Sequence, residues 1–217
     1  GKVSVESACG DSIWLKSYVT DKGALRLVHR EGNSGSYLGA GLFLWDTKSV
    51  AVKFDENHEV LWSKYFDVLG SCEGVNFNDG SSMFNVQNVA NNKGYIVKLD
   101  QFGELEWEKE LIFENNGINS NRIVNFLEDA LIVQSGQIIR MSIDGVVKWT
   151  KYNKDFLPSS IFTARDSSIW VVGKDKTSSE TTSILNLDQN GNLVFQKQLS
   201  LNIFPKDIYQ IEKGDVF

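Results

Sequence analysis

The sequence predicts an all-β protein, and more narrowly a β-propeller built from four-stranded antiparallel blades. Three observations support this fold class. A segment with the pattern of a β-hairpin recurs four times along the 217 residues. Further short strand-like segments precede these hairpins, so that a unit of about 45 residues holds four strands, as a propeller blade does. No long window has the 3.6-residue apolar period and capping residues of an α-helix.

The recurring segment alternates apolar and polar residues, turns at an Asp three residues before a Gly, and continues as Gly-x-Leu-x-Trp-x-Lys. Ser142 replaces the Asp once, and His58 replaces the Gly once. Asp and Gly supply the side-chain caps and the positive φ of a tight turn between two strands. The marker aromatic residues are separated by 45, 42 and 46 residues, and they are Trp62, Trp107, Trp149 and Phe195.

Alternation with a period of two places the apolar residues of each predicted strand on one face of the sheet. Val97 and Leu99 share that face, and we expect Leu105 and Trp107 to continue it on the returning strand. The marker tryptophans are expected to be packing residues. A lysine follows each marker by two residues, and we expect its stem to lie on the sheet while its ammonium group reaches water.

A degraded copy of the hairpin lies upstream, at Gly23–His29, with Leu27 in the marker position and the strand-like Ile13–Val19 before it. The C-terminal residues from Ile208 resemble the first half of a blade. We therefore predict one domain over residues 1–217, with five blades closed by strands from both termini, which would leave no exposed sheet edge. The alternative is a fragment of a longer ring of seven or eight blades. The predicted blade hairpins lie near residues 13–29, 50–65, 95–109, 137–151 and 183–198.

Composition narrows the classes of function. The formal charge of −6 disfavours nucleic-acid binding, which usually needs a basic patch. No apolar run approaches the ~20 residues of a membrane-spanning helix. Cys9 and Cys72 are compatible with one disulfide in an oxidising compartment, and equally with two buried free thiols.

Few residues have the spacing of a catalytic or metal site, and we assign no catalytic residue and no metal ligand. His29 and His58 are expected to be surface residues. The loop that begins at Asp188 resembles the start of a calcium loop, but its glycine is fourth and a strand follows at once. Alternating glutamates from Glu104 to Glu110 predict a solvated strand face. Trp45, beside polar residues at a strand end, is the best candidate for an exposed ligand-binding platform.

The hairpins resemble the quinoprotein-like (PQQ-like) propeller repeats, especially those of secreted and surface proteins of bacteria. Lys98-Leu99-Asp100 with Gly103 and Trp107 carry this resemblance, as do Leu187-Asp188 with Gly191 and Phe195. Members of that class include quinone-dependent dehydrogenases, outer-membrane assembly lipoproteins and exported proteins. The dehydrogenases are typically eight-bladed, with a Ca²⁺-bound cofactor and a catalytic aspartate. No local cluster corresponds to that site, so we carry over no cofactor.

These observations favour a non-catalytic binding or assembly module that is extracellular, on the cell surface or periplasmic. Its loops would present a surface to a protein or glycan partner, because function on rigid scaffolds usually lies in loops. The Gly- and Ser-rich segment from Arg30 to Gly41 is one expected contributor. The first alternative is a glycosidase-like hydrolase with carboxylates at the central channel. The second is a spacer domain of a multidomain surface adhesin.

Overall fold

The computed structural model describes residues 3–6, 12–15, 24–30, 37–43, 48–57, 59–68, 70–88, 90–91, 93–111, 121–134, 136–153, 155–176 and 181–200. All the regular structure in these ranges is β-strand, so they contain no helix that could cross a membrane. The strands form one two-stranded sheet and four four-stranded sheets.

The two-stranded sheet contains β1 (Val3–Glu6) and β2 (Ser12–Leu15). We call the four-stranded sheets blades 1 to 4. Blade 1 contains β3 (Ala24–Arg30), β4 (Tyr37–Phe43), β5 (Lys48–Phe54) and β6 (Val60–Phe66). Blade 2 contains β7 (Cys72–Asn76), β8 (Ser82–Asn88), β9 (Lys93–Leu99) and β10 (Leu105–Leu111). Blade 3 contains β11 (Asn121–Phe126), β12 (Asp129–Gln134), β13 (Gln137–Ser142) and β14 (Val147–Tyr152). Blade 4 contains β15 (Phe156–Thr163), β16 (Ile169–Asp175), β17 (Thr182–Leu187) and β18 (Leu193–Leu199).

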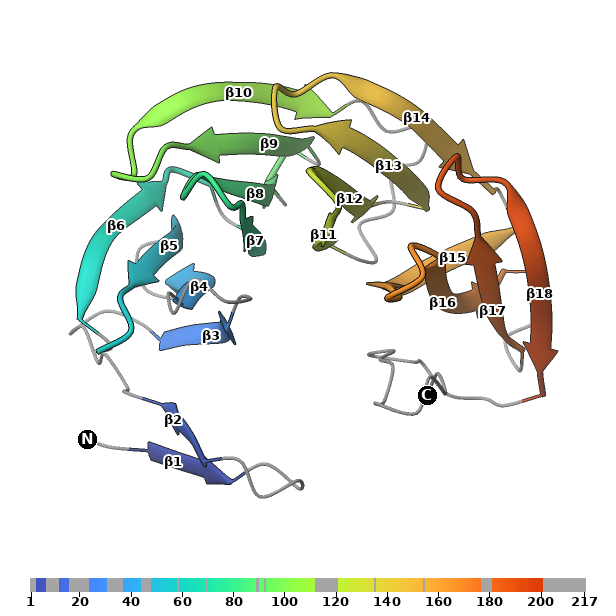
Figure 1. Ribbon diagram of the computed structural model, residues 1–217, viewed down its shortest axis with the longest axis horizontal. Helices are drawn as coiled ribbons and strands as arrows, with labels where there is room; N and C mark the ends of the chain where they lie inside the picture. Colours follow the sequence, from blue (N-terminus) through green and yellow to red (C-terminus); the bar gives the residue numbers. More distant parts are fainter. Residues whose placement is uncertain are drawn as a thin grey trace.

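Within each blade the strands are antiparallel and neighbours in sequence order. The blades follow one another around a common centre, with the first strand of each blade innermost and the fourth outermost (Figure 1). The inner strand β11 contacts both β7 and β15. This arrangement is a β-propeller, which confirms the fold class predicted from the sequence. We call strands 1 and 2 of a blade its inner hairpin, and strands 3 and 4 its outer hairpin.

The core lies between the blades. One cluster joins Met83 and Ile96 of blade 2 to Ala130 and Ile132 of blade 3, and all four side chains are fully buried. Similar clusters lie between blades 1 and 2 and between blades 3 and 4. Blades 2 and 3 therefore bury both faces against their neighbours, and contacts between blades stabilise the arrangement.

The four recurring segments form the outer hairpins, and their turns are closed as the sequence pattern implies. The Asp100 carboxylate accepts hydrogen bonds from the backbone N–H groups of Phe102 and Glu104, both at 2.8 Å. Asp55 and Asp188 cap their own turns in the same way. Where Ser142 replaces the Asp, its hydroxyl accepts one such bond, from Val146 at 3.1 Å. The aspartates of the motif therefore shape turns.

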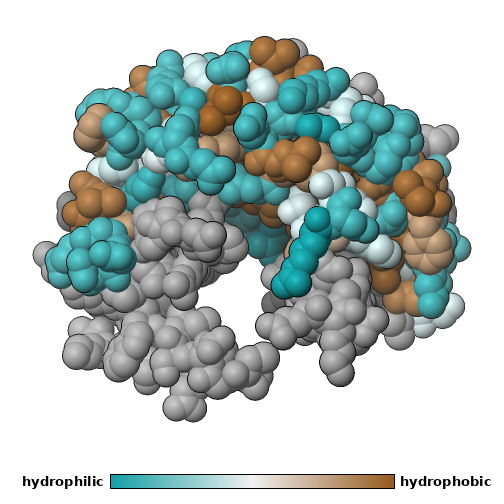
Figure 2. Space-filling model, viewed as in Figure 1, coloured by the Kyte–Doolittle hydropathy of each residue, from teal (hydrophilic) through white to brown (hydrophobic). Residues whose placement is uncertain are grey.

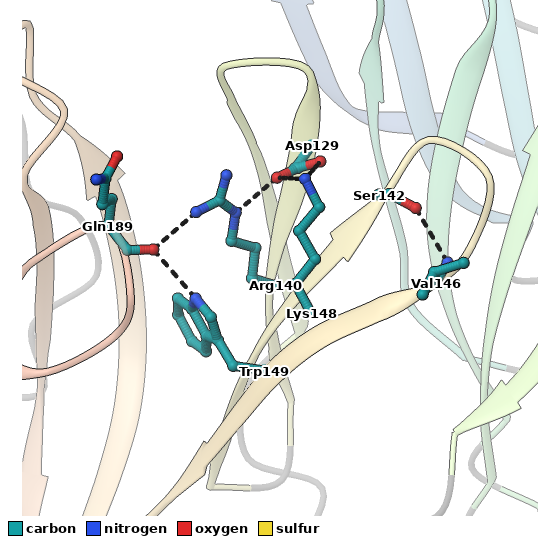
Figure 3. Close-up of polar contacts among 7 residues, drawn as sticks. All are labelled: Asp129, Arg140, Ser142, Val146, Lys148, Trp149 and Gln189. Carbon is teal, nitrogen blue, oxygen red and sulfur yellow. Dashed lines mark hydrogen bonds and ion pairs between the residues drawn. The ribbon is translucent and has the colours of Figure 1, made fainter.

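The tryptophans of the motif join each blade to the next. Trp62 Nε1 donates a hydrogen bond to the backbone carbonyl of Gln101 at 3.2 Å. Trp107 donates to Ile143 at 3.3 Å, and Trp149 donates to Gln189 at 3.1 Å (Figure 3). Each acceptor lies in the outer turn of the following blade, directly after the capping Asp or Ser. The repeat is thus a device for docking one blade on its neighbour.

Glycine is required in these turns for two reasons. Gly103 has φ +83°, a left-handed conformation that other residues rarely adopt. A Cβ at Gly103 would also lie 2.8 Å from ring atoms of Trp62. Gly145 and Gly191 have φ +76° and +74°, and they lie against Trp107 and Trp149.

Polar side chains add to these junctions. Lys109 is exposed, and its Nζ also donates a hydrogen bond to the carbonyl of Gly145 in the next blade at 2.6 Å. Between blades 3 and 4, Arg140 donates both to Asp129 at 2.6 Å and to the carbonyl of Gln189 at 2.7 Å. Lys148 Nζ forms a second ion pair with the Asp129 carboxylate, at 2.8 Å (Figure 3).

The structure corrects the prediction that Leu105 continues the buried face. Leu105 is 52% exposed, whereas Trp107 packs on the core between blades 2 and 3. The pairing of β10 with β9 shifts register between these two residues, so simple alternation does not hold across the start of the strand. Such a shift occurs in the outer hairpin of every blade, and Val60, Val147 and Leu193 are similarly exposed.

The predicted hairpin at residues 13–29 is wrong. β2 pairs with β1, and β3 pairs with β4 as the inner strand of blade 1, so Leu27 does not occupy a marker position. The separation of 35 residues between Leu27 and Trp62 is indeed shorter than the other spacings. A better match to the motif is Gly10, Trp14 and Lys16, with Ser7 in the Asp position. Trp14 lies in β2, 48 residues before Trp62. Five blades and closure by residues 201–217 remain predictions, because that segment lies outside the described residues.

Candidate functional site

The two ends of the propeller carry different connections. Because the strands are antiparallel, the turns of the inner and outer hairpins lie at one end, which we call the upper end. The connections between strands 2 and 3 lie at the lower end, as does the passage from one blade to the next. In the part of blades 1 to 4 that the structure describes, the upper end therefore brings together the inner turns at residues 77–81, 127–128 and 164–168 and the outer turns that follow β5, β9, β13 and β17.

An open cavity of about 220 Å³ lies at the upper end between blades 2 and 3. Three turns contribute to it: the inner turn of blade 2, the inner turn of blade 3 and the outer turn of blade 3. Its lining combines amide, carboxylate and apolar side chains. The lining residues are Asn76, Phe77, Asn78, Asp79, Asn125, Leu127, Glu128 and Ile143.

The blade 2 wall is held by its own hydrogen bonds. Asp79 accepts from the backbone N–H of Ser81 at 2.9 Å and from its hydroxyl at 2.6 Å. Burial acts to raise the pKa of Asp79, but these bonds and the nearby Lys98 charge outweigh it, so that the pKa lies below its ordinary value. Lys53 of blade 1 donates to the carbonyl of Gly80 at 2.6 Å and fixes the turn from the other side. The wall thus presents an ionised carboxylate at neutral pH.

The blade 3 wall contains a strained residue. Leu127 and Glu128 form a two-residue turn between Phe126 and Asp129. Leu127 has φ +58°, yet it is 62% exposed and gains little from packing. A left-handed conformation is unfavourable for a leucine by about 1–2 kcal/mol. Such strain is concentrated at functional positions in proteins, and here it presents an apolar side chain at the cavity mouth.

The floor of the cavity contains buried amides on two inner strands. Asn76 is 4% exposed, and its Oδ1 accepts from the Ser82 hydroxyl at 2.6 Å. Asn125 Nδ2 donates to the backbone carbonyl of Asn76 at 2.7 Å, and Thr163 donates to the carbonyl of Asn125 at 3.2 Å. These bonds connect the inner strands of blades 2, 3 and 4. Asn76 Nδ2 is fully buried and has no hydrogen-bond partner.

A second, more open groove of about 460 Å³ lies on the side of the ring between β6 and blade 2. Its deepest residues, Val86, Val97 and Leu99, belong to the core between blades 1 and 2. Because it continues a packing interface, we regard the upper-end cavity as the stronger candidate site.

None of the described residues that line the upper-end cavity was singled out as a site residue from the sequence. Trp45, Cys9 and His58 lie outside the described residues. The structure describes the backbone of His29, in β3, but not its side chain. Cys72 is buried, and burial and the charge of Glu73 raise the pKa of its thiol. The disulfide alternative for Cys9 and Cys72 stays a prediction.

Two further expectations can be compared with the structure. The glutamates of β10 are exposed, as expected, and two of them pair with lysines: Glu106 with Lys98 at 2.6 Å and Glu110 with Lys93 at 2.9 Å. Part of the segment from Arg30 to Gly41 was expected to be an irregular loop, but its residues from Tyr37 onward form β4. In the part of the chain that the structure describes, no three His, Cys, Asp or Glu side chains lie close enough to hold a metal ion.

No protein-family model matches the chain, and no curated protein is similar enough in sequence to match. Solved structures do match. A Bacteroides caccae protein of unknown function aligns with a TM-score of 0.60 and 14% identity, over 97% of this chain and 76% of its own. The Dos1 propeller aligns with a TM-score of 0.62 and 11% identity, over 97% of this chain and 54% of its own.

A quinoprotein alcohol dehydrogenase-like protein from Bacteroides thetaiotaomicron aligns with a TM-score of 0.54 and 11% identity, over 78% of this chain and 45% of its own. The chain thus spans about three quarters of the first of these proteins and about half of the other two. These likenesses support the β-propeller class and, at the level of the fold, the resemblance to PQQ-like propellers.

Proposed function

We propose that this protein is a non-catalytic binding module that presents the upper end of its propeller to a protein or glycan ligand. The observation that carries the proposal is the cavity between blades 2 and 3, which gathers polar and apolar side chains from three turns. The junctions between blades hold these turns in fixed positions. A preformed site on a rigid scaffold binds without a large ordering cost.

The distribution of exposed apolar residues supports the same end of the molecule. Apolar side chains that follow the outer turns are roughly half exposed, as Leu105 and Leu193 illustrate. Phe102 and Leu127, in an outer and an inner turn, are 71% and 62% exposed. Figure 2 shows apolar residues in separate clusters around the periphery, divided by hydrophilic ones. Exposed apolar clusters with polar borders are typical of interaction surfaces.

We extend the proposal to an extracellular, cell-surface or periplasmic location, for which the basis is the resemblance of the hairpins to the repeats of secreted bacterial proteins. A module of this kind could also serve as a spacer domain in a surface adhesin. The full reading frame of the gene separates these two roles, because an adhesin would carry further domains on either side.

A hydrolase is the second candidate function, because Asp79 and Glu128 line the same cavity. Glycoside hydrolysis uses two carboxyl groups, one of which must be protonated to act as the general acid. The lowered pKa of Asp79 suits an ionised role only. Release of nitrophenol from a panel of nitrophenyl glycosides would support this alternative if Asp79→Asn and Glu128→Gln both abolished it.

A pair of substitutions tests the binding function. Asn78→Arg introduces a long cation at an exposed cavity residue, whereas Ala90→Arg makes the same kind of change at an exposed lower-end residue. Binding to a glycan array and to candidate partner proteins, followed by heating scans with the hits, should be lost in Asn78→Arg and kept in Ala90→Arg. Retention by Asn78→Arg together with loss in Ala90→Arg would place the binding surface elsewhere.

A further inference from the structure

We propose that the face of blade 4 that points away from blade 3 is a docking surface within the chain, and that the hairpin of β1 and β2 occupies it. We call this face the open face. In the proposed contact, Phe195 docks on the segment between β1 and β2 as the marker tryptophans dock on the outer turns of blades 2, 3 and 4. The inference goes beyond the proposed function, because it concerns the assembly of the scaffold and not the ligand.

The open face has the composition of a face that meets another blade. Ile169 and Val171 of β16 pack on the core between blades 3 and 4. Trp170 and Val172 alternate with them and therefore face away from blade 3. Ile184 of β17 lies on the same side, because it pairs with Val172. A sheet that is apolar on both sides needs cover on both.

The equivalent positions of blade 3 are buried by the blade that follows it. Leu131 and Trp170 each pair with the residue two positions before the capping Ser or Asp of their own outer turn. Leu131 is 0% exposed, and Ile138, the counterpart of Ile184, is 5% exposed. Trp170 and Ile184 are only partly buried. The described blades therefore do not give the open face the cover that blade 4 gives to blade 3.

Phe195 differs from the other marker residues in the same way. It is 46% exposed, whereas Trp62 is 9% exposed at its junction with blade 2. Its ring contacts that of Trp170, with 6.4 Å between the ring centroids. The three marker tryptophans each donate to an outer turn whose glycine has a positive φ. By the same pattern, the partner of Phe195 is an outer turn with such a glycine.

The segment that joins β1 to β2 has the sequence of an outer turn. β1 and β2 are antiparallel and directly paired, and residues 7–11 connect them. The outer hairpins of blades 2 and 4 have connections of the same length, at residues 100–104 and 188–192. The motif spacing is kept by Ser7, Gly10, Trp14 and Lys16. Gly10 therefore corresponds to the glycine on which a marker ring docks.

The position of β1 and β2 in the chain makes them the outer hairpin of the blade before blade 1. Residues 16–23 lead from β2 to the inner strand β3, as residues 112–120 lead from β10 to the inner strand β11. β1 and β2 lie in the gap of the ring between blades 1 and 4 (Figure 1). A hairpin tethered there has a higher effective concentration at the open face than the hairpin of a second copy. A two-stranded sheet is also only marginally stable by itself, so it gains from docking.

The proposed docking separates the two cysteines. Cys9 takes the second position after the capping residue, and this position is exposed in all four outer turns of blades 1 to 4. Its occupants there are Asn57, Phe102, Asp144 and Asn190. Cys72 begins the inner strand β7 at the lower end and is 4% exposed. We therefore expect Cys9 to be an accessible thiol at the upper end and Cys72 to be unreactive.

Chemical cross-linking through Cys9 tests the inference. The substituted residue is Lys197, which follows the marker Phe195 by two positions, as Lys151 follows Trp149. A Cβ at Gly191 would lie 3.2 Å from Cγ of Lys151, so a thiol at position 197 should lie close to the turn that contains Gly10. Lys197→Cys keeps Phe195 in place. An ethylene-bridged bis-maleimide should join its thiol to Cys9 within one chain, which peptide mapping detects.

The matched control is Lys109→Cys, an exposed residue at the same motif position in blade 2. Its yield of cross-link to Cys9 should be at least about tenfold lower, because blade 2 lies away from the gap. Equal yields in the two variants overturn the inference. Links that join two chains also overturn it and assign the open face to a second copy. A Cys9 that fails to react with a single maleimide overturns it as well, since the docked turn exposes this position.

Discussion

The outer and inner hairpins of the blades differ in what their turns contact. The outer turns of blades 2, 3 and 4 are alike in composition because each of them docks the tryptophan of the preceding blade, as the turn at Gln101 docks Trp62. The inner turns differ in length and sequence: five residues link β7 to β8, but only Leu127 and Glu128 link β11 to β12. Repetition therefore marks the contacts that hold the ring, and variation marks the place where a specific cavity can form.

The largest expected effect tests the structural half of this comparison. Trp62→Ala removes a side chain that is 9% exposed and contacts the Phe84 ring edge-on at 6.2 Å. We expect the free energy of unfolding to fall by about 3–5 kcal/mol, as for other buried aromatic residues. Urea unfolding followed by circular dichroism measures it. Trp62→Phe keeps most of the packing and loses the bond to Gln101, so its loss should be about 1 kcal/mol.

An intermediate effect separates docking from backbone conformation. Gly103 and Gly80 both have φ +83°, but only a Cβ at Gly103 would strike Trp62. Gly80→Ala should cost about 1–2 kcal/mol for the left-handed backbone. Gly103→Ala should cost that amount and about 1–3 kcal/mol more, because the indole must shift. Equal losses in the two variants would contradict the docking role of the outer turn.

The smallest expected effect lies in the inner turn of blade 2. Ser81→Ala removes a 2.6 Å bond to Asp79, so the pKa of Asp79 should rise toward its ordinary value. A carboxylate whose pKa is lower in the folded state stabilises it above the unfolded pKa of about 3.9 and loses this contribution as the pH falls through the folded pKa. The stability difference between the two proteins, about 1 kcal/mol at pH 7, should therefore shrink below about pH 4.

Urea unfolding at a series of pH values, together with NMR titration of the Asp79 carboxyl, measures this effect. A difference that is constant down to pH 2 would show that Ser81 acts without the carboxylate. Because the inner turn is held by bonds within itself, we expect its variants to change stability less than those of the outer hairpin.

Much of the fold could be predicted from the sequence because the motif is local. The Asp that caps a turn and the Gly with positive φ act within five residues, so the four outer hairpins can be predicted from the sequence alone. The exposure of Leu105 could not be predicted, since a shift in strand register breaks the alternation there. The misplaced first hairpin has a signal in the sequence: Gly10, Trp14 and Lys16 repeat the motif spacing better than the segment that contains Leu27.

The candidate site was not predictable, because its lining comes from three turns that are far apart in sequence. Asn78 and Asp79 read as ordinary turn residues, and nothing near them indicates that Glu128 and Ile143 lie across the same cavity. The hydrogen bonds by which the tryptophans dock on the next blade were also not predictable, because they too join residues far apart in sequence. Each one joins residues that are 36 to 40 positions apart, such as Trp107 and Ile143.

Amide hydrogen exchange, measured with and without a saturating ligand found on the glycan array or among the candidate partner proteins, tests the central claim most directly. If inner turns bind while outer turns hold the ring, exchange should slow at residues 77–80 and 127–129. It should change less in the outer turns at residues 100–104 and 188–192, which do not line the cavity. Protection of those outer turns with no change at the inner ones would contradict the division of roles between the two hairpins.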